Sequence, residues 1–216
     1  MLTIYGVYRS RALRNIWLLE EMGQPFQHVP VVQNFRAGGD AGVMHSRSPA
    51  FLAVSPNGGI PAMQDGALVL SESLAINLYI ARRYGGPLAA ADLAEEGLIA
   101  QWTLFGATEI EPRSIQILYN RVQLPPDQRN EAKVAEAIAA LRVPFATIDA
   151  ALATTGFLIG GRFTVADINL AEVVRYTLPA PEVLDAAPRV KAWLAACHAR
   201  PAWKKIMARR EEEPAL

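Results

Sequence analysis

The sequence predicts an α/β domain of order βαβ-ββα followed by an all-α domain that forms a helical bundle. Short β-rich runs alternate with helical runs up to about residue 84, and almost all of the remaining chain has helical periodicity. Residues 85–91 are rich in Gly, Pro and Ala, a composition that is typical of a connection. We therefore predict domains over residues 1–84 and 92–216, joined by this linker.

The first domain is expected to contain four short strands and two helices. In chain order these are a strand at 2–5, a helix at 12–22, a strand at 26–32, a loop at 33–50, strands at 61–64 and 67–70, and a helix at 71–84. Gly23 and the Gly85-Gly86 pair suit the helix ends. Asp65-Gly66 lies between the last two β-rich runs and predicts a hairpin turn.

The helices of the second domain are marked by their termini. One is expected from Asp92 to about Tyr119, one from about Asp127, and one from Thr164, with further helices toward the C-terminus. Pro112 and Pro144 predict kinks in the first two, because proline removes an intrahelical hydrogen bond. Thr164 and Asp167 have the spacing of a capping box.

Composition argues for an ordinary globular protein of a reducing compartment. The 21 basic residues balance the 21 acidic ones, so there is no general attraction to nucleic acid or to an anionic membrane. The chain has neither an 18-residue apolar run nor a signal-peptide pattern, and its one cysteine, Cys197, cannot form an internal disulfide. We expect a cytoplasmic location. His28, His45 and His198 lie far apart, so we expect no metal site.

The strongest local signal is Ser55-Pro-Asn-Gly-Gly-Ile-Pro-Ala-Met63. Pro61 falls at the start of a predicted strand, where it cannot donate to a ladder, and so indicates a strand edge or a special turn. A cis bond would turn the amide and carbonyl of Ile60 outward, where they could pair with a bound peptide. A trans turn proline is the alternative.

Glu72 and Ser73 open the helix that follows the hairpin. One interpretation is structural, with Ser71 as the N-cap and Glu72 favourably placed at the helix dipole. The other is functional: the amide and hydroxyl of Ser73 hold a carboxylate, and Glu72 accepts from an ammonium group. A γ-glutamyl group carries both charges.

Ser10 follows the first strand and is either an N-cap or a hydroxyl that donates to a thiolate. A free thiol has a pKa of about 8.5, so roughly 3% of it is ionised at pH 7. Lowering that pKa by about two units requires ~2.7 kcal/mol. A charge-assisted hydrogen bond of ~1.5–3 kcal/mol and a helix N-terminus worth ~0.3–1 kcal/mol together supply it. Tyr8 is a rival hydroxyl, whereas Tyr5 is expected to pack.

These segments, in this order, resemble the cytosolic glutathione transferase superfamily. The likeness rests on Leu2-Thr-Ile-Tyr-Gly, Ser10-Arg-Ala-Leu-Arg-Asn, Pro56-Asn-Gly-Gly-Ile-Pro61, Glu72-Ser73 and Thr164-Val-Ala-Asp167, and it covers essentially the whole chain. Each motif is weak alone, and their order and spacing make the match specific. The resemblance implies a thioredoxin-like N-terminal domain and a homodimer. It also places the chain with bacterial-style members of the serine-type classes, which include phi and theta.

The same resemblance assigns roles to residues. It implies that Pro61 is cis, that Ile60 pairs with the cysteinyl backbone of glutathione, and that Glu72 and Ser73 bind its γ-glutamyl end. Ser10 matches the activating hydroxyl. For the glycyl carboxylate, Arg47 fits the phi-like spacing and His45 lies nearby, although both also read as solvated loop residues.

The expected activity is detoxifying transfer of glutathione to a small hydrophobic electrophile, or reduction of a peroxide, with glutathione as co-substrate and no permanently bound cofactor. Tyr8, Phe105, Glu109 and Arg113 are candidates for the second-substrate pocket, and the last two also have the spacing of a surface ion pair. Two alternatives stay open. One is a non-catalytic scaffold, and the other is a specialised glutathione-dependent isomerase, dehalogenase or lyase. The sequence does not name the electrophile.

Overall fold

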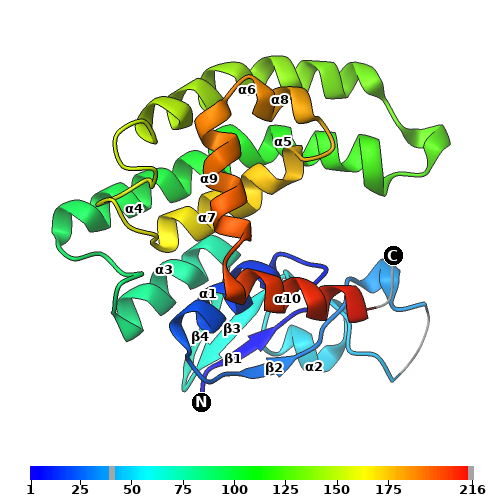
Figure 1. Ribbon diagram of the computed structural model, residues 1–216. Helices are drawn as coiled ribbons and strands as arrows, with labels where there is room; N and C mark the ends of the chain where they lie inside the picture. Colours follow the sequence, from blue (N-terminus) through cyan, green and yellow to red (C-terminus); the bar gives the residue numbers. More distant parts are fainter. Residues whose placement is uncertain (39–41, 214–216) are drawn as a thin grey trace. The chain divides into compact units, whose positions relative to one another are not determined.

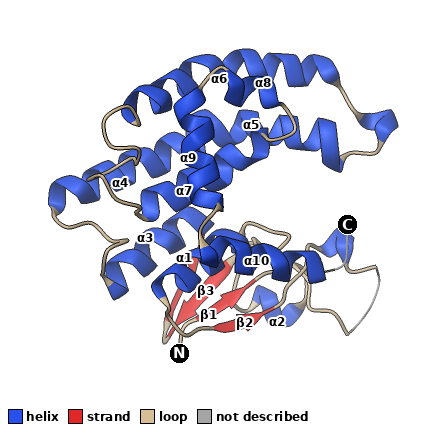
Figure 2. Cartoon of the chain, viewed as in Figure 1, coloured by secondary structure: helices blue, strands red, loops and turns tan. Residues whose placement is uncertain are grey.

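The computed structural model describes residues 1–38 and 42–213, and the chain divides by its internal contacts into two compact units (Figure 1). Unit 1 consists of Met1–Gly86 together with Arg200–Leu216, and unit 2 consists of Pro87–Ala199. The predicted fold class is confirmed, because the four-stranded sheet of unit 1 precedes the helices of unit 2 (Figure 2).

Unit 1 is a mixed sheet in the order β2-β1-β3-β4. Its elements are β1 (Thr3–Tyr5), α1 (Ala12–Met22), β2 (Gln27–Val29), the 3₁₀ turn η1 (Asn34–Arg36), α2 (Pro49–Leu52), β3 (Ala62–Asp65), β4 (Leu68–Ser71), α3 (Ser73–Tyr84) and α10 (Pro201–Glu212). β1 is parallel to β2, as a helical crossover requires, and antiparallel to β3. β2 is shorter than the predicted strand because Pro30 has no amide to donate to the ladder.

The hairpin is present, but its turn lies one residue later than predicted. Asp65 pairs with Leu68 inside the ladder, so the two turn residues are Gly66 and Ala67. Gly66 has φ 61°, while Ala67 keeps an ordinary negative φ. A tight turn that needs a positive φ only at its first residue selects glycine there.

Different helices cover the two faces of the sheet. α1 and α3 pack together on one face through buried apolar side chains that include Leu13, Ile16, Ile76 and Ile80. On the other face, Phe51 of α2 packs with Val31 and Ala62. Tyr5 joins this second cluster, with its ring centroid 6.2 Å from that of Phe51, so its expected packing role is confirmed. The predicted loop at 33–50 contains η1 and the start of α2.

α10 belongs by its contacts to unit 1, although the predicted domain boundary assigns it to the helical domain. Trp203 stacks on Trp17 of α1, with ring centroids 4.6 Å apart. Two Arg200 nitrogens each lie 2.8 Å from a carboxylate oxygen of Glu21. These two residues are 179 positions apart, so no local sequence pattern predicts the contact. α10 therefore completes the covering of α1.

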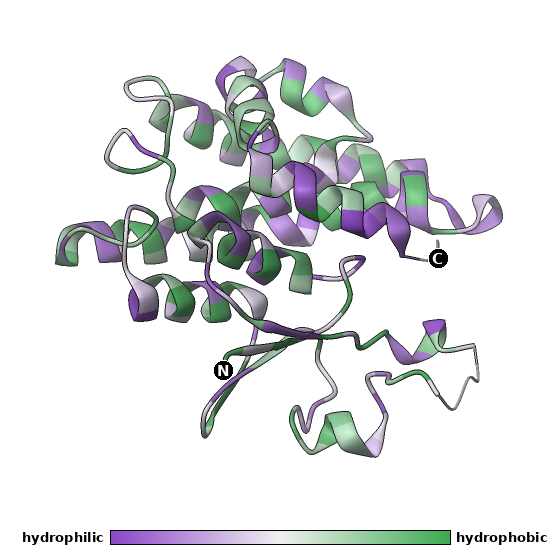
Figure 3. Ribbon diagram, turned by 60° about the horizontal axis from the view of Figure 1, so that its bottom comes forward, coloured by the Kyte–Doolittle hydropathy of each residue, from purple (hydrophilic) through white to green (hydrophobic). Residues whose placement is uncertain are grey.

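Unit 2 is helical throughout its regular elements. These are α4 (Leu93–Phe105), a π-helical segment (Gly106–Ile110), α5 (Glu111–Leu118), a second π-helical segment (Tyr119–Gln123), a 3₁₀ turn (Pro126–Gln128), α6 (Glu131–Ala151), α7 (Val165–Val174), a 3₁₀ turn (Arg175–Thr177), α8 (Pro181–Asp185) and α9 (Pro188–His198). Apolar and polar stretches alternate along these helices (Figure 3). No helix within the described residues is both long and apolar enough to span a bilayer.

The helix starts of unit 2 are set by side-chain caps. Asp92 accepts from the amide of Glu95 at 2.8 Å, and Thr164 forms the predicted capping box with Asp167. The start predicted at about Asp127 was wrong. Asn130 caps α6 instead, because Asp127 lies within a separate 3₁₀ turn.

The two internal prolines of unit 2 occupy different settings. Pro112 lies at the start of α5, directly after a π-helical segment, and such segments are a common origin of a change in helix direction. Pro144 lies inside α6 and is buried. At Pro112 the helical path changes from a π-helical segment to α5, and at Pro144 the α-helix α6 continues through the proline.

Candidate functional site

Ser10 lies between β1 and α1, with its hydroxyl beside the first turn of the helix. Its Oγ accepts from the amide of Ala12 at 3.1 Å and donates to the carbonyl of Val7 at 2.7 Å. Arg11 is the N-cap residue of α1, so the N-cap interpretation of Ser10 was wrong by one position, although the Ser10 hydroxyl still satisfies one otherwise unpaired amide of the helix start. The hydroxyl donates to a neutral carbonyl oxygen, and a negatively charged acceptor would form a stronger hydrogen bond with it.

Gly6 brings Ser10 and Ile60 together. A Cβ atom added to Gly6 would lie 2.8 Å from Cγ2 of Ile60 and 3.3 Å from Oγ of Ser10. Gly6 also has φ 144°, a conformation that side chains disfavour. Only glycine at this position lets both side chains approach the end of β1. The peptide bond between Ile60 and Pro61 is cis, in agreement with the expectation from the resemblance.

The loop before Pro61 is held by its own polar groups and presents the backbone of Ile60. Ser55 Oγ donates to the carbonyl of Gly59 at 3.2 Å, and the amide of Gly59 donates to Asn57 Oδ1 at 3.0 Å. Among the described residues, no main-chain hydrogen bond uses the amide or carbonyl of Ile60. These two groups are suited to pairing with an extended peptide.

The junction of β4 and α3 carries the second predicted subsite. Glu72 is the N-cap residue of α3, and Ser71, the predicted cap, belongs to β4. Glu72 has φ 67° and is the one non-glycine residue with positive φ in the described ranges. Such backbone strain is concentrated at functional sites. Ser73 is almost fully buried at the first turn of the helix.

Arg14 is a residue of this subsite that the sequence reasoning missed. Its side chain is 1% exposed, and its Nη1 donates to Ser73 Oγ at 3.1 Å. The neighbouring Asn15 donates to the carbonyl of Ser73 at 2.7 Å. A buried guanidinium beside a helix N-terminus creates a positive potential that favours a carboxylate. The signal was present in the sequence, because Arg14 follows Ser10 by one helical turn.

The two basic candidates for the glycyl carboxylate differ in their contacts. A Cβ atom added to Gly58 would lie 3.1 Å from Nη1 of Arg47, so this guanidinium lies against the loop that leads to Ile60. The ring of His45 accepts from the amide of Arg47 at 3.2 Å and thereby stabilises its own turn. This geometry favours Arg47, whose planar guanidinium matches the geometry of a carboxylate.

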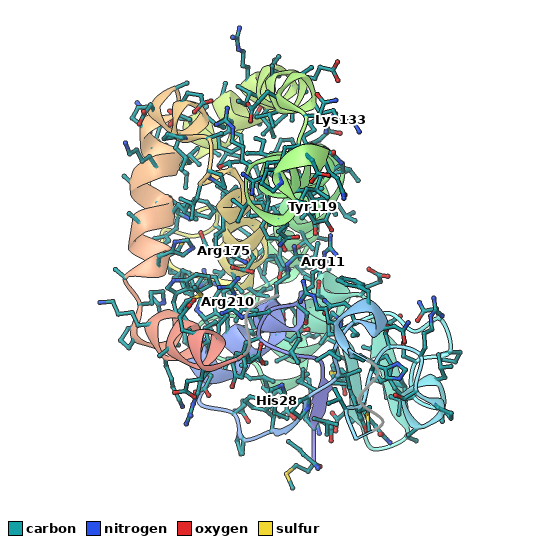
Figure 4. All side chains as sticks on the ribbon, turned by 90° about the vertical axis from the view of Figure 1, so that its right-hand side faces the viewer. Arg11, His28, Tyr119, Lys133, Arg175 and Arg210 are labelled. Carbon is teal, nitrogen blue, oxygen red and sulfur yellow. The ribbon has the colours of Figure 1, made fainter. Side chains whose placement is uncertain are left out.

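Tyr8, the rival hydroxyl, lies toward β2 and α10. Its ring meets the ring of His28 edge-on, with centroids 5.1 Å apart, and His28 is labelled on β2 in Figure 4. Burial raises the pKa of Tyr8, and the negative charge of Glu20 raises it further, against the effects of Arg209 and Lys205. The choice between the two hydroxyls rests on position: Ser10 lies with Ile60 beside Gly6, whereas the ring of Tyr8 packs on His28, so Ser10 is the better candidate.

The candidates for the second substrate in unit 2 make local contacts. The ring of Phe105 packs edge-on against Trp102 at 5.6 Å. Arg113 forms an i,i+4 ion pair with Glu109 at 3.3 Å, as the structural interpretation of this pair predicts. Arg113 also lines a hollow of about 340 Å³ together with residues of α6 that include Lys133, labelled in Figure 4. Because Tyr8 belongs to unit 1, one pocket shared by all four residues stays a prediction.

Buried ionisable groups of unit 2 serve its fold. Asp167 accepts from the amide of Thr164 at 2.8 Å and from the indole of Trp193 at 2.9 Å, and its burial raises its pKa against these hydrogen bonds. Burial lowers the pKa of His198 to about 4. Within the described ranges, no three His, Cys, Asp or Glu side chains gather in an arrangement that could hold a metal ion.

Comparison with known proteins identifies the family of both units. Residues 9–83 match the family model of the glutathione S-transferase N-terminal domain, and residues 103–201 match that of the C-terminal domain. Glutathione S-transferase 3 of Zea mays is 34% identical over 219 residues, which cover 96% of this chain and 93% of that protein.

Solved structures agree with the sequence matches. The theta class glutathione S-transferase of Xanthomonas axonopodis pv. citri, determined with glutathione bound, is 33% identical, with a TM-score of 0.80 over 94% of this chain and 95% of that one. Glutathione transferase F7 of Populus trichocarpa is 27% identical, with a TM-score of 0.83 over 97% and 99% of the two chains. The chain therefore belongs to the glutathione S-transferase family and is a glutathione-dependent transferase.

Proposed function

We propose that unit 1 binds glutathione in an extended conformation and that Ser10 stabilises its thiolate. The observation that carries this proposal is the contact of both Ser10 and Ile60 with Gly6. A cysteinyl backbone paired with Ile60 would bring its short side chain close to the Ser10 hydroxyl. Glutathione bound to the related Xanthomonas enzyme supports the choice of ligand.

The γ-glutamyl group is assigned to the start of α3. Its carboxylate would accept from the amide and hydroxyl of Ser73, with the guanidinium of Arg14 behind that hydroxyl. Its ammonium would donate to the carboxylate of Glu72. The glycyl carboxylate at the other end is assigned to Arg47, with His45 as the alternative cation.

The reaction forms a bond between the glutathione sulfur and an electrophilic carbon. The thiol proton leaves to solvent when glutathione binds, and the leaving group departs with its bonding electrons. Ser10 donates to the sulfur while it is negatively charged, so the hydrogen bond is charge-assisted. Glutathione is consumed as a co-substrate, and the second substrate is a small hydrophobic electrophile. With a peroxide instead, the sulfur attacks a peroxide oxygen, the O–O bond breaks to release an alcohol or water, and a second glutathione converts the resulting sulfenic acid to the disulfide and water.

The oligomeric state and the cellular location are also proposals that rest on family membership. A homodimer and a cytoplasmic location are typical of the family. The edge strand β4 exposes Leu68 and Val69, apolar side chains that a second copy of the chain could cover. Light scattering of the purified chain tests the dimer, since a monomeric mass at micromolar concentration would exclude it.

The proposed function is tested by titration and turnover together. Calorimetry should detect millimolar or tighter binding of glutathione, and conjugation to an aryl halide should be faster than the uncatalysed reaction. Heat of binding without turnover of aryl halides, peroxides or halogenated substrates would favour the non-catalytic scaffold. Absence of any binding heat would reject the site.

A further inference from the structure

Glu213, at the end of the described chain, is bound to the loop that carries Ser10. Its two carboxylate oxygens accept from the amides of Tyr8 and Arg9, each at 2.8 Å. Both are charge-assisted hydrogen bonds to main-chain amides, and one carboxylate bridges two successive residues. The contact joins segments separated by more than 200 positions in the sequence.

The same stretch of backbone is held from its other side by a second charged group. Nη1 of Arg36 donates to the carbonyl of Arg9 at 3.0 Å. Arg9 also donates from Nε to the main-chain carbonyl of Glu213 at 3.3 Å, and its guanidinium lies 3.7 Å from the carboxylate of Glu211. The residue directly before Ser10 is therefore fixed through its amide, its carbonyl and its side chain.

The contacts of Glu213 are connected to the Ser10 hydroxyl through the β-turn formed by residues 7–10. The amide of Ser10 donates to the carbonyl of Val7 at 3.1 Å, which makes Tyr8 and Arg9 the two central residues of the turn. The same Val7 carbonyl accepts the Ser10 hydroxyl. Glu213 binds the two central amides, so a shift of its carboxylate moves the turn and the hydroxyl with it.

We propose that Glu213 is a positioning residue for the reaction: by holding the amides of Tyr8 and Arg9, it fixes the Ser10 hydroxyl where it can donate to the glutathione thiolate. The inference rests on the proposed role of Ser10. A displacement of the order of 1 Å in such a hydrogen bond can cost up to about 100-fold in rate.

A simple tether for α10 is the competing role, and other contacts already fill it. α10 is fastened to α1 by the ion pair of Arg200 with Glu21, by that of Lys205 with Glu20, and by the stacked indoles of Trp203 and Trp17. Loss of the Glu213 carboxylate leaves these contacts in place. Its substitution therefore probes the turn more than the docking of the helix.

The experiment uses the full chain with Glu213→Ala and Glu213→Gln, and with Glu212→Gln as the matched control. Glu212 carries the same charge one residue earlier and pairs with Arg209 of its own helix. The readouts are the ultraviolet absorbance of the glutathione thiolate as a function of pH, kcat and KM with an aryl halide, and the melting temperature. The titratable and charged groups around the Glu213 carboxylate and the turn are Tyr8, Arg9, Glu20, Arg36, Lys205, Arg209 and Glu211, so each variant requires a complete pH profile.

In Glu213→Ala, the pKa of the bound thiol should rise by about one unit, and kcat should fall by about 10-fold near pH 6.5, with the KM for glutathione within about twofold. Glu213→Gln keeps one oxygen acceptor, so its thiol pKa and its kcat should lie between those of Glu213→Ala and the unmodified chain. Glu212→Gln should leave the thiol pKa unchanged. A lower melting temperature with an unchanged thiol pKa would mark a tether and overturn the proposal.

A second set of variants in the Ser10→Ala background separates the two assignments. If Glu213 acts through Ser10, Glu213→Ala should produce no further rise of the thiol pKa in that background. An equal rise in both backgrounds would overturn the inference while leaving the Ser10 assignment intact. If Ser10→Ala alone leaves the thiol pKa unchanged, the role of Ser10 is rejected, and the inference about Glu213 is rejected with it.

Discussion

The hydroxyl of Ser10 donates to the carbonyl oxygen of Val7 at 2.7 Å. The proton that the proposed mechanism requires is therefore already held in place by a neutral acceptor. A thiolate is a charged acceptor, and hydrogen bonds to charged groups are roughly twice as strong as neutral ones. On the proposed mechanism, rotation about the Cβ–Oγ bond would transfer the donor from Val7 to the bound sulfur. The amide of Ala12 meanwhile keeps the oxygen in position.

Ser10→Ala should raise the pKa of bound glutathione by about one to two units and lower kcat/KM about 10- to 100-fold near pH 6.5. The same change removes the hydrogen bond from the Ala12 amide to the Ser10 hydroxyl, so the free energy of unfolding should fall by about 1 kcal/mol. Thiolate absorbance and chemical denaturation measure the two effects separately. Ser10→Thr keeps the hydroxyl and should retain most activity. Full activity in Ser10→Ala would exclude Ser10 as the activator.

Glu72→Gly should separate stability from binding. The left-handed conformation of Glu72 costs an ordinary residue ~1–2 kcal/mol, and glycine in its place costs ~0.5–1 kcal/mol in entropy. We expect the free energy of unfolding to rise by about 0.5–1 kcal/mol. The affinity for glutathione should fall about 10-fold, because the ammonium group of the ligand loses the Glu72 carboxylate. Calorimetry and urea denaturation measure these quantities. Glu72→Gln is the control, since it should weaken binding without the gain in stability.

Arg14→Met should raise the KM for glutathione about 10-fold with little change in kcat. The reason is that Arg14 supports Ser73, which binds a part of the substrate that does not react. Steady-state kinetics with varied glutathione measures this, and Arg11→Met supplies an exposed control at the N-cap of the same helix. A fall in kcat at constant KM would contradict the assignment of Arg14 to the γ-glutamyl subsite.

His198 should make the protein less stable in acid. Its pKa is lowered to about 4 in the folded chain by burial, against an ordinary value of 6.5, so the unfolded state binds the proton first. The contribution of neutral His198 to the free energy of unfolding is therefore fully present above pH 6.5. It declines between pH 6.5 and pH 4 by about 1.4 kcal/mol per pH unit. Urea denaturation of His198→Gln should show a shallower slope over this range. An identical slope would assign the acid sensitivity to other groups.

Local patterns were sufficient for much of the fold. The capping box of Thr164 and Asp167, the cap at Asp92 and the β-hairpin are interactions among neighbouring residues, and each is present in the structure. Predictions were weakest at element ends, where two local solutions compete. The hairpin turn lies at Gly66 and Ala67 instead of Asp65 and Gly66, and Asn130 caps α6 instead of a residue near Asp127.

The candidate site was predictable where its residues lie in short motifs. Ser10, Ile60, Glu72 and Ser73 each stand at an element boundary that the sequence marks. Arg14 escaped notice because an arginine on an apolar helix reads as a solvated residue, and only the packing of α1 against α3 shows it to be 1% exposed. The choice of Arg47 over His45 likewise depends on which loop each side chain meets.

The sequence by itself determined the order of elements, the family and the motif residues, because these depend on periodicity, turn chemistry and caps that act over a few positions. Only the tertiary structure decided that Ser10 and Ile60 meet at Gly6, that Arg14 supports Ser73, and that α10 returns to unit 1 so that Glu213 binds the Ser10 loop. Each of these contacts joins residues at least 50 positions apart. Such contacts form because burial of the surrounding apolar side chains brings distant segments together, and no local pattern encodes the partner.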